Sequence, residues 1–348
     1  MATDRIVGRP RCAVPSASVL SIGFMVAFTG CIGAAEQPHE RAAAVVPEYT
    51  LAADQSHSRF SRMIPPVLRV ASGAVIEAFL QEASAGQLTP SSSIEELTAL
   101  SFDPIHPLTG PVYVEGAEPG DVLAVTLHEI EIQDWGWVAS IPGFGLLADE
   151  FPEPALRTFR FERGATHVRF NDRIRVPLRP FPGVMGVAPA TDSLLSTIPP
   201  RANGGNMDNP YLTEGTTVYF PVLVEGALFS IGDPHAAQGK GEVSGTGIEA
   251  PLRVVYQLEL LKGARPIPEP QYETDAFYAV TAYATTLDEA VQKATRYMID
   301  YLVAEHGLER DDAYLLASIA ADLEIAEVVD MPHVLVAMHI AKDVLGVR

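Results

Sequence analysis

The density of proline and glycine limits the fold of this chain more than any other feature of its sequence. Its 348 residues include 28 prolines and 27 glycines, and both residue types break the interior of a helix. Short apolar stretches lie between them, at 67–70, 75–80 and 122–127, and the last of these has the pattern of a half-buried strand. The sequence therefore predicts many short strands joined by shaped loops.

A weak internal rhythm refines this prediction. Three times a short glycine turn introduces an apolar or β-branched strand, at 72–75, 119–122 and 214–218, as the stacked sheets of a sandwich or jelly roll would require. The character of the chain changes near 261–270, and a capping box at 286–289 then opens an amphipathic helix. We predict an α+β, mainly β fold.

Two folded parts are expected within it. The first is a large β-sandwich or jelly-roll-like catalytic domain over residues 49–262, and the second is a small C-terminal α+β domain over residues 263–348.

The first 31 residues resemble a targeting segment. Three arginines precede a weakly apolar run at 19–28, and Gly30-Cys31 follows it, which is the order of regions in a secretory signal. We therefore expect an exported protein. A start placed too far upstream is the alternative, and it would leave the protein in the cytoplasm.

The end of this segment leaves two kinds of processing open. Phe28-Thr-Gly-Cys31 approximates a bacterial lipobox, in which Cys31 would carry a lipid, whereas ordinary cleavage would fall near Ala34-Ala35. Residues 32–48 are small and polar and are interpreted as a tether. The mature protein is expected to be periplasmic, and to contact the membrane only if Cys31 carries a lipid.

Cysteine usage and net charge exclude several classes of protein. Both cysteines, Cys12 and Cys31, lie in the leader, so the remainder has no disulfide and no thiol nucleophile. Amide hydrolases with a Glu–Lys–Cys set are thereby excluded. The net charge of −20 repels phosphate backbones, so no nucleic-acid partner is expected.

The region 198–249 holds the densest set of side chains suited to chemistry. Two glycine-rich loops and the strand after them supply carboxylates, amides and one histidine: Asn206, Asp208, Asp233, His235, Gln238, Glu242 and Glu249. Mixed histidine and carboxylate ligands suit Zn²⁺ or a similar divalent ion. A free carboxylate such as Glu115 or Asp233 could take a proton from water. The alternative is that these loops only connect strands and that Asp233 stabilises a turn; no HExxH, CxxC or GxSxG spacing decides between the two.

A loop-rich stretch between residues 134 and 189 contains Trp137 and Phe144. Buried aromatic anchors would explain it structurally, and the wall of a pocket would explain it functionally. The two interpretations are compatible.

Several longer motifs occur in a fixed order along the chain: His57 with 64–68, then 106–121, 134–137, 141–145, 180–189, 198–200, 204–208, 235–239 and 321–330. Through them the sequence resembles the acetamidase/formamidase family over roughly residues 50–348. The departures from the family pattern, at Pro234, Lys240 and 57–60, concern substrate selectivity.

The resemblance implies a β-sandwich-based, metal-dependent hydrolase that releases ammonia and a carboxylate from short linear amides, acting on carbon–nitrogen bonds other than peptide bonds. The resemblance also implies a bound divalent metal ion, with Zn²⁺ expected in preference to Ca²⁺. The residues predicted for the site are Asp208, His235 and Glu249 for metal, Glu115, Asp233 and His57 for catalysis, and Asn206, Gln238, Trp137 and Phe144 for the pocket.

Two alternatives stay open at this point. One is an exported, non-catalytic protein that binds a small molecule on the same fold, and the other is a related hydrolase of longer amides or carbamates. The expected partner is a small amide, and a homo-oligomer is neither predicted nor excluded.

Overall fold

The computed structural model of the protein describes residues 45–346, which form one compact unit. The predicted leader and most of the predicted tether lie outside the described residues. Among these residues, no helix has both the length and the apolar character needed to cross a membrane.

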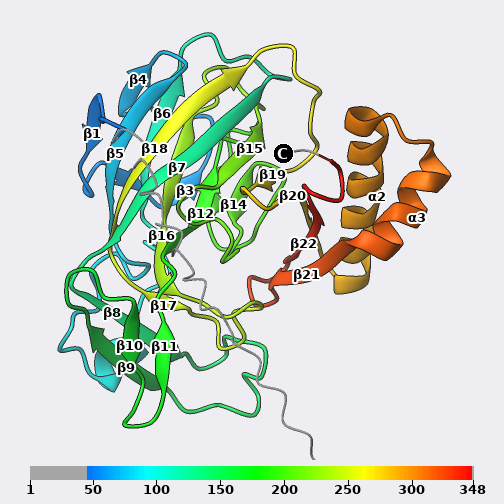
Figure 1. The fold of residues 1–348 in the computed structure, drawn as a ribbon. Coiled ribbons are helices and arrows are strands. Elements are labelled where there is room, and N and C mark those ends of the chain that lie inside the picture. The colour runs from blue at the N-terminus through cyan, green and yellow to red at the C-terminus, as the bar shows by residue number, and fades with distance from the viewer. Residues whose placement is uncertain (1–44, 347–348) are drawn as a thin grey trace, which may run out of the picture. The chain divides into compact units, whose positions relative to one another are not determined.

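Two nine-stranded sheets make up most of the fold (Figure 1). The first sheet has the order β1 (Tyr49–Leu51), β5 (Ala74–Leu80), β18 (Leu252–Leu261), β7 (Val122–Ile132), β15 (Thr217–Pro221), β19 (Gln271–Glu273), β20 (Phe277–Ala284), β22 (Val334–Ala341) and β21 (Ala321–Glu327).

The second sheet has a branched path. Its main order is β14 (Gly204–Asn206), β12 (Phe181–Gly186), β16 (Phe229–Ala237), β17 (Ile248–Glu249), β8 (Trp135–Ser140) and β9 (Ala155–Arg160). Strand β6 (Leu108–Val114) joins it at β16 and also pairs with β2 (Ser56–His57) and β4 (Leu68–Val70). Two small pairs complete the strands, β10 (His167–Arg169) with β11 (Arg175–Pro177), and β3 (Arg59–Phe60) with β13 (Leu195–Ser196).

One apolar core joins the two sheets. Ile76 on β5 and Val125 on β7 come from the first sheet, while Val112 on β6, Met185 on β12 and Phe229 on β16 come from the second, and none of the five is exposed to solvent. Each sheet turns one face to the other, and the central strands of the second sheet, β12 and β16, are buried along their whole length.

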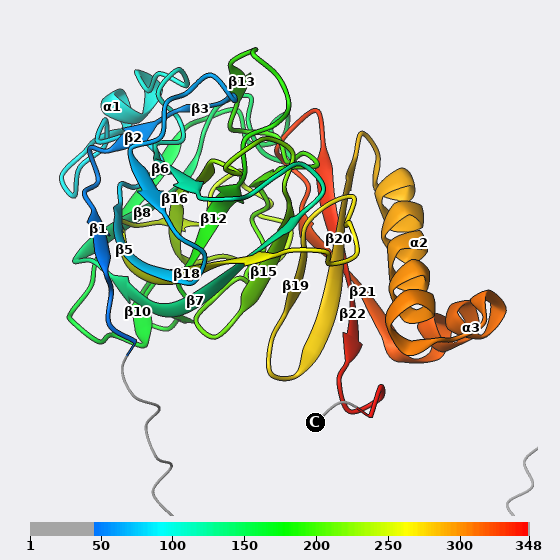
Figure 2. The same ribbon diagram turned by 90° about the horizontal axis from the view of Figure 1, so that it is seen from above.

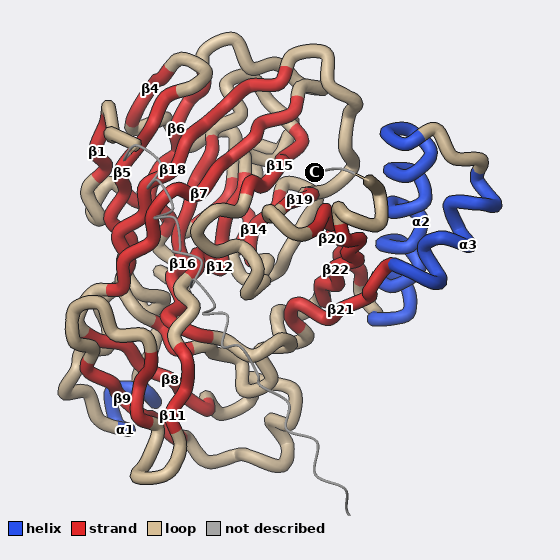
Figure 3. Tube along the Cα trace, viewed as in Figure 1, coloured by secondary structure: helices blue, strands red, loops and turns tan. Residues whose placement is uncertain are grey.

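Within residues 45–346, helices occur in two places (Figure 3). The short helix α1 (Ile94–Thr98) lies beside β9. Helices α2 (Leu287–His306) and α3 (Arg310–Ala320) cover the outer face of the C-terminal strands, as the view from above shows (Figure 2). Helix α2 begins after Thr286, whose side chain accepts from the backbone N–H of Glu289, and ends before Gly307, which has a φ of 67°.

These features confirm the predicted α+β, mainly β fold. The predicted boundary between residues 262 and 263 falls in the turn after β18. Beyond it, β19 pairs directly with β15, so the C-terminal strands extend the first sheet. Division into two domains stays a prediction about the organisation of the sequence.

Candidate functional site

Strand pairing in the second sheet places the central side chains in a row. His235 on β16 lies directly opposite Glu249 on β17, and Glu249 lies opposite Trp137 on β8. Asp233 precedes His235 by two residues, so the two side chains point to the same face of the strand. A bulge after His235 ends this regular pairing.

Two loops bring further carboxylates to this row. Asp208 follows β14, and its backbone carbonyl accepts a hydrogen bond of 2.7 Å from Gln238 Nε2. Glu242 lies in the loop between β16 and β17. This loop is tied to the first sheet, because Gly241 N–H donates to the carbonyl of Ala326 at the end of β21 (2.7 Å).

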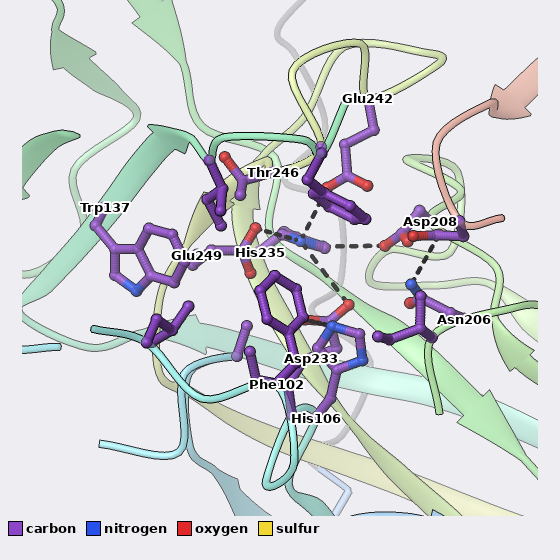
Figure 4. Close-up of a pocket in the computed structure, with 18 residues that line it drawn as sticks. Phe102, His106, Trp137, Asn206, Asp208, Asp233, His235, Glu242, Thr246 and Glu249 are labelled. Carbon is purple, nitrogen blue, oxygen red and sulfur yellow. Dashed lines mark hydrogen bonds and ion pairs between the residues drawn. The ribbon is translucent and has the colours of Figure 1, made fainter. Parts of the chain in front are cut away.

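Four carboxylates surround His235 (Figure 4). Its Nε2 lies 2.9 Å from Glu249 Oε1, 3.4 Å from Glu242 Oε1 and 4.0 Å from Asp233 Oδ2. Its Nδ1 lies 3.6 Å from Asp208 Oδ1. All five residues are buried, with exposed fractions of 1–6 %.

The backbone holds three of these carboxylates in a strained conformation. Asp208, Asp233 and Glu242 have φ angles of 37°, 51° and 47°, in the left-handed region that side chains other than glycine seldom adopt. Such backbone costs on the order of 1–3 kcal/mol per residue and persists where the surrounding fold enforces it, as at functional sites.

The electrostatics of the cluster are unbalanced without a further cation. Burial raises the pKa of Asp208, and burial together with neighbouring carboxylates raises the pKa of Asp233 and Glu242 well above the usual range. Burial alone would lower the pKa of His235, but Glu249 and Asp233 raise it well above its usual value. One imidazolium cannot neutralise four buried carboxylates, so ionisation of the whole set requires another positive charge.

The donor set fits a divalent metal ion. Both carboxylate oxygens of Asp208, Oδ1 of Asp233, Oε2 of Glu249 and Nδ1 of His235 find no hydrogen-bond partner among the described residues. Buried polar atoms are normally paired. Two groups have their ligand atoms close enough to share an ion, Asp208–His235–Glu242 and Asp233–His235–Glu249.

A glycine leaves room beside the cluster. At Gly183 on β12, a Cβ atom would lie nearest Asp208 Oδ1, 2.7 Å from Asp233 Oδ2 and 2.8 Å from His235 Cε1. The space at the centre of the cluster therefore depends on the absence of a side chain at residue 183.

A cavity of about 40 Å³ opens onto this cluster. Its polar lining includes Asn206, His106 and the carboxylates. The rest of its lining is largely apolar: Ala83, Leu100, Phe102, Ile105, Trp137, Ile141, Phe144 and Ile198. Trp137 is held in place because its Nε1–H donates to Glu82 Oε2 (2.7 Å).

Most residues predicted for the site come together here. Asp208, Asp233, His235, Glu249, Asn206, Trp137 and Phe144 line the cavity. Gln238 does not line the cavity, but its side chain hydrogen-bonds to the backbone carbonyl of Asp208.

His57 and Glu115 do not line the cavity. His57 Nδ1–H donates to the carbonyl of Arg59 (2.6 Å), so its Nε2 accepts from the hydroxyl of Ser230 on β16 (2.8 Å). Burial lowers the pKa of His57 to about 4, which keeps this ring neutral. His57 therefore contacts β16 through Ser230, away from the cavity lining, and its catalytic role stays a prediction.

Glu115 also lies away from the cavity lining. It follows the last residue of β6, where its side chain is 56 % exposed and pairs with Arg69 at 3.4 Å. This position lies in the turn after β6. The assignment of Glu115 as a catalytic base stays a prediction.

Three residues of the site were absent from the predicted set: Glu242, His106 and Asp330. His106 Nε2 lies 3.6 Å from Asp233 Oδ1, and Asp330 Oδ2 accepts from Asn206 Nδ2 at 2.8 Å. Each lies within a segment that the sequence had already distinguished, the second glycine-rich loop, the motif at 106–121 and the motif at 321–330. The sequence therefore marked each of these segments, but it did not show that they meet in one site.

The fold and the site together define a class of protein: a two-sheet β protein with a buried histidine–carboxylate cluster that could hold a divalent ion at the end of a small cavity. A family model described as the acetamidase/formamidase family matches residues 47–196 and 191–346. The chain belongs to this family, which confirms the resemblance.

Solved structures and a curated relative agree. A predicted acetamidase/formamidase from Thermoanaerobacter tengcongensis is 33 % identical, with a TM-score of 0.81, 86 % of this chain covered and 98 % of that chain. An acetamidase from Bacillus halodurans is 31 % identical, with a TM-score of 0.80 and coverage of 85 % and 98 %. The acetamidase of Mycolicibacterium smegmatis is 28 % identical in an alignment of 268 positions that covers 60 % of this chain and 66 % of that protein. This chain spans 60–66 % of the length of the curated relatives that it matches.

Proposed function

We propose that the protein hydrolyses short linear amides of the formamide and acetamide type, releasing ammonia and a carboxylate. The observation that carries this proposal is the small cavity that is lined both by the His235 cluster and by an apolar wall. A volume of about 40 Å³ corresponds to roughly three water molecules. Formamide and acetamide have three and four non-hydrogen atoms, so they match this space.

The metal ligands we propose are Asp208 and His235, completed by Glu242. Because His235 Nε2 is engaged by Glu249 Oε1 (2.9 Å), the ring would bind the ion through Nδ1, which faces Asp208 Oδ1 at 3.6 Å and would lose its proton on binding the ion. A carboxylate that accepts from the second nitrogen of a ligating histidine fixes its ring and raises its basicity. Glu249, predicted as a ligand, would then orient the ring instead.

A divalent ion, Zn²⁺ in our proposal, would lower the pKa of a water molecule and polarise the amide carbonyl when bound there. The residues of the chain supply the rest. Asp233 faces the same space, takes a proton from the attacking water and passes it to the departing nitrogen. The apolar wall, with Trp137 and Phe144, receives the alkyl group of the acyl part.

The test is ammonia release from formamide, acetamide and propionamide by the purified protein, with elemental analysis before and after chelation. We expect turnover with stoichiometric metal, loss on chelation and recovery with Zn²⁺. Absence of turnover on every short amide by the metal-loaded protein would refute the proposal. Full activity without metal would refute the metal-dependent part alone.

Two isosteric variants test the ligand assignment. Asp208→Asn removes a ligand and should abolish metal binding. Glu249→Gln keeps an oxygen that can accept from His235, and it should weaken metal affinity by about 10- to 100-fold. Equal loss of metal in both variants would contradict the assignment and return Glu249 to the ligands.

A further inference from the structure

A second, larger cavity lies next to the first. It has a volume of about 450 Å³, and its lining includes Leu146, Leu147, Phe151 and Val243. Three of these side chains, Leu146, Phe151 and Val243, are more than half exposed. Of the described residues, Phe144 alone lines both cavities.

The ring of Phe144 is held from several directions. Its backbone N–H donates to the carbonyl of Ile141 (3.0 Å), and two residues later Leu146 N–H donates to the carbonyl of Val243 (3.0 Å). The ring packs edge-on against Phe102, with centroids 5.9 Å apart. It also rests on Gly245, where an added Cβ would approach Cε1 to 2.6 Å.

The two cavities differ in what they can accept. The inner one ends at the carboxylate cluster and has room for only a few atoms. The outer one is mostly apolar, and a methylene chain gains from burial on such a surface. Because Phe144 is the described residue common to both linings, a substrate longer than the inner cavity would reach the outer one past Phe144.

We propose that Phe144 sets the upper limit on the acyl chain of the substrate. Its ring separates the space for the reacting amide from an apolar groove that would otherwise accept an alkyl tail of about four carbons. This inference deepens the proposed function and rests on it. Replacing the ring by a small side chain would join the cavities and extend the substrate range to amides with longer, apolar acyl groups.

The experiment compares kcat/KM for hexanamide and acetamide in the wild type and in Phe144→Ala. Each buried methylene contributes about three- to fourfold, so the ratio of hexanamide to acetamide should rise by about tenfold or more. Phe170→Ala is the matched control, because Phe170 is a partly exposed ring that packs on Arg157 and lines neither cavity. This control should leave the ratio unchanged.

Two further variants test where the alkyl tail of the substrate binds and provide an alternative if Phe144→Ala does not fold. In the Phe144→Ala background, Phe151→Ala removes a wall of the outer groove and should reduce the gain. Phe144→Leu keeps an apolar side chain and should produce a smaller gain if Phe144→Ala fails to fold.

Titration with hexanoate separates this inference from the proposed function, because it requires no turnover. Phe144→Ala should bind hexanoate about tenfold more tightly than the wild type. If no amide is hydrolysed but hexanoate binding shows this gain, the proposed function fails and the separating role of Phe144 stands. An unchanged ratio together with unchanged hexanoate binding, or a wild type that hydrolyses hexanamide as well as acetamide, overturns the inference.

Discussion

Gly183→Ala should disable the site through a single added methyl group. Gly183 lies on β12, which pairs with β14 on one side and β16 on the other, so its backbone has little freedom to move away. The added Cβ would stand 2.7 Å from Asp233 Oδ2 and 2.8 Å from His235 Cε1, with Asp208 Oδ1 closer still.

The size of the effect follows from these distances. Ordinary contact begins near 3.4 Å, so three cluster side chains must each retreat by more than half an ångström. A misplacement of about 1 Å can cost roughly 100-fold in rate, and we expect kcat/KM to fall by about that factor. Overpacking of this kind should lower the free energy of unfolding by about 1–3 kcal/mol.

The assay combines ammonia release, metal content and urea unfolding on one preparation. Gly239→Ala is the matched control, because a Cβ at residue 239 would meet nothing within 4 Å, and it should leave all three quantities unchanged. If Gly183→Ala kept its metal and its full turnover, the space at residue 183 would have no part in the site, and the geometric reasoning above would be wrong.

Three further predictions can be checked independently. The Glu82 carboxylate accepts four hydrogen bonds, from Ser84 N–H, Ser84 Oγ–H, Gly86 N–H and Trp137 Nε1–H. Glu82→Gln should therefore lower the free energy of unfolding by about 3 kcal/mol, measured by urea unfolding, and raise KM, measured by steady-state kinetics. Unchanged stability would contradict this role of Glu82. Burial lowers the pKa of His339 to about 4 despite the nearby Glu324. As the pH falls below about 6.5, His339 therefore binds a proton in the unfolded state but not in the folded state. The free energy of unfolding should drop by about 2 kcal/mol between pH 7.5 and 5. His339→Asn should remove most of this drop in chemical denaturation; an equal drop in the variant would assign it to other groups. The leader predicts export, so the intact mass of protein from a native-like host should lack residues up to about Cys31, and full-length cytoplasmic chain would contradict this.

Much of the fold could be predicted because its signals are local. The capping box at 286–289 and Gly307 define α2 from neighbouring residues alone, and the structure places its ends there. The density of glycine and proline likewise predicts short strands. The pairing of β19 with β15 could not be predicted in this way, because it depends on residues more than fifty positions apart in the sequence.

The site could likewise be predicted only where its residues lie close together in the sequence. Asp233 and His235 are neighbours on one strand, and Glu249 follows one loop later. Asp330 could not be placed because it lies in the loop between β21 and β22, 124 positions along the chain from its partner Asn206. Glu115 is the opposite case: the motif that surrounds it was its only signal, and the structure shows that its side chain turns to solvent beside Arg69.

The contribution of the C-terminal strands bears on how the protein is made. Asp330, at position 330 of 348, lines the cavity, and the loop that carries Glu242 hydrogen-bonds to the end of β21 through Gly241. The pocket is therefore incomplete on a nascent chain until the last strands have been synthesised. Ion uptake should follow biosynthesis, and a chain shortened at its C-terminus should lose the site before it loses the sandwich.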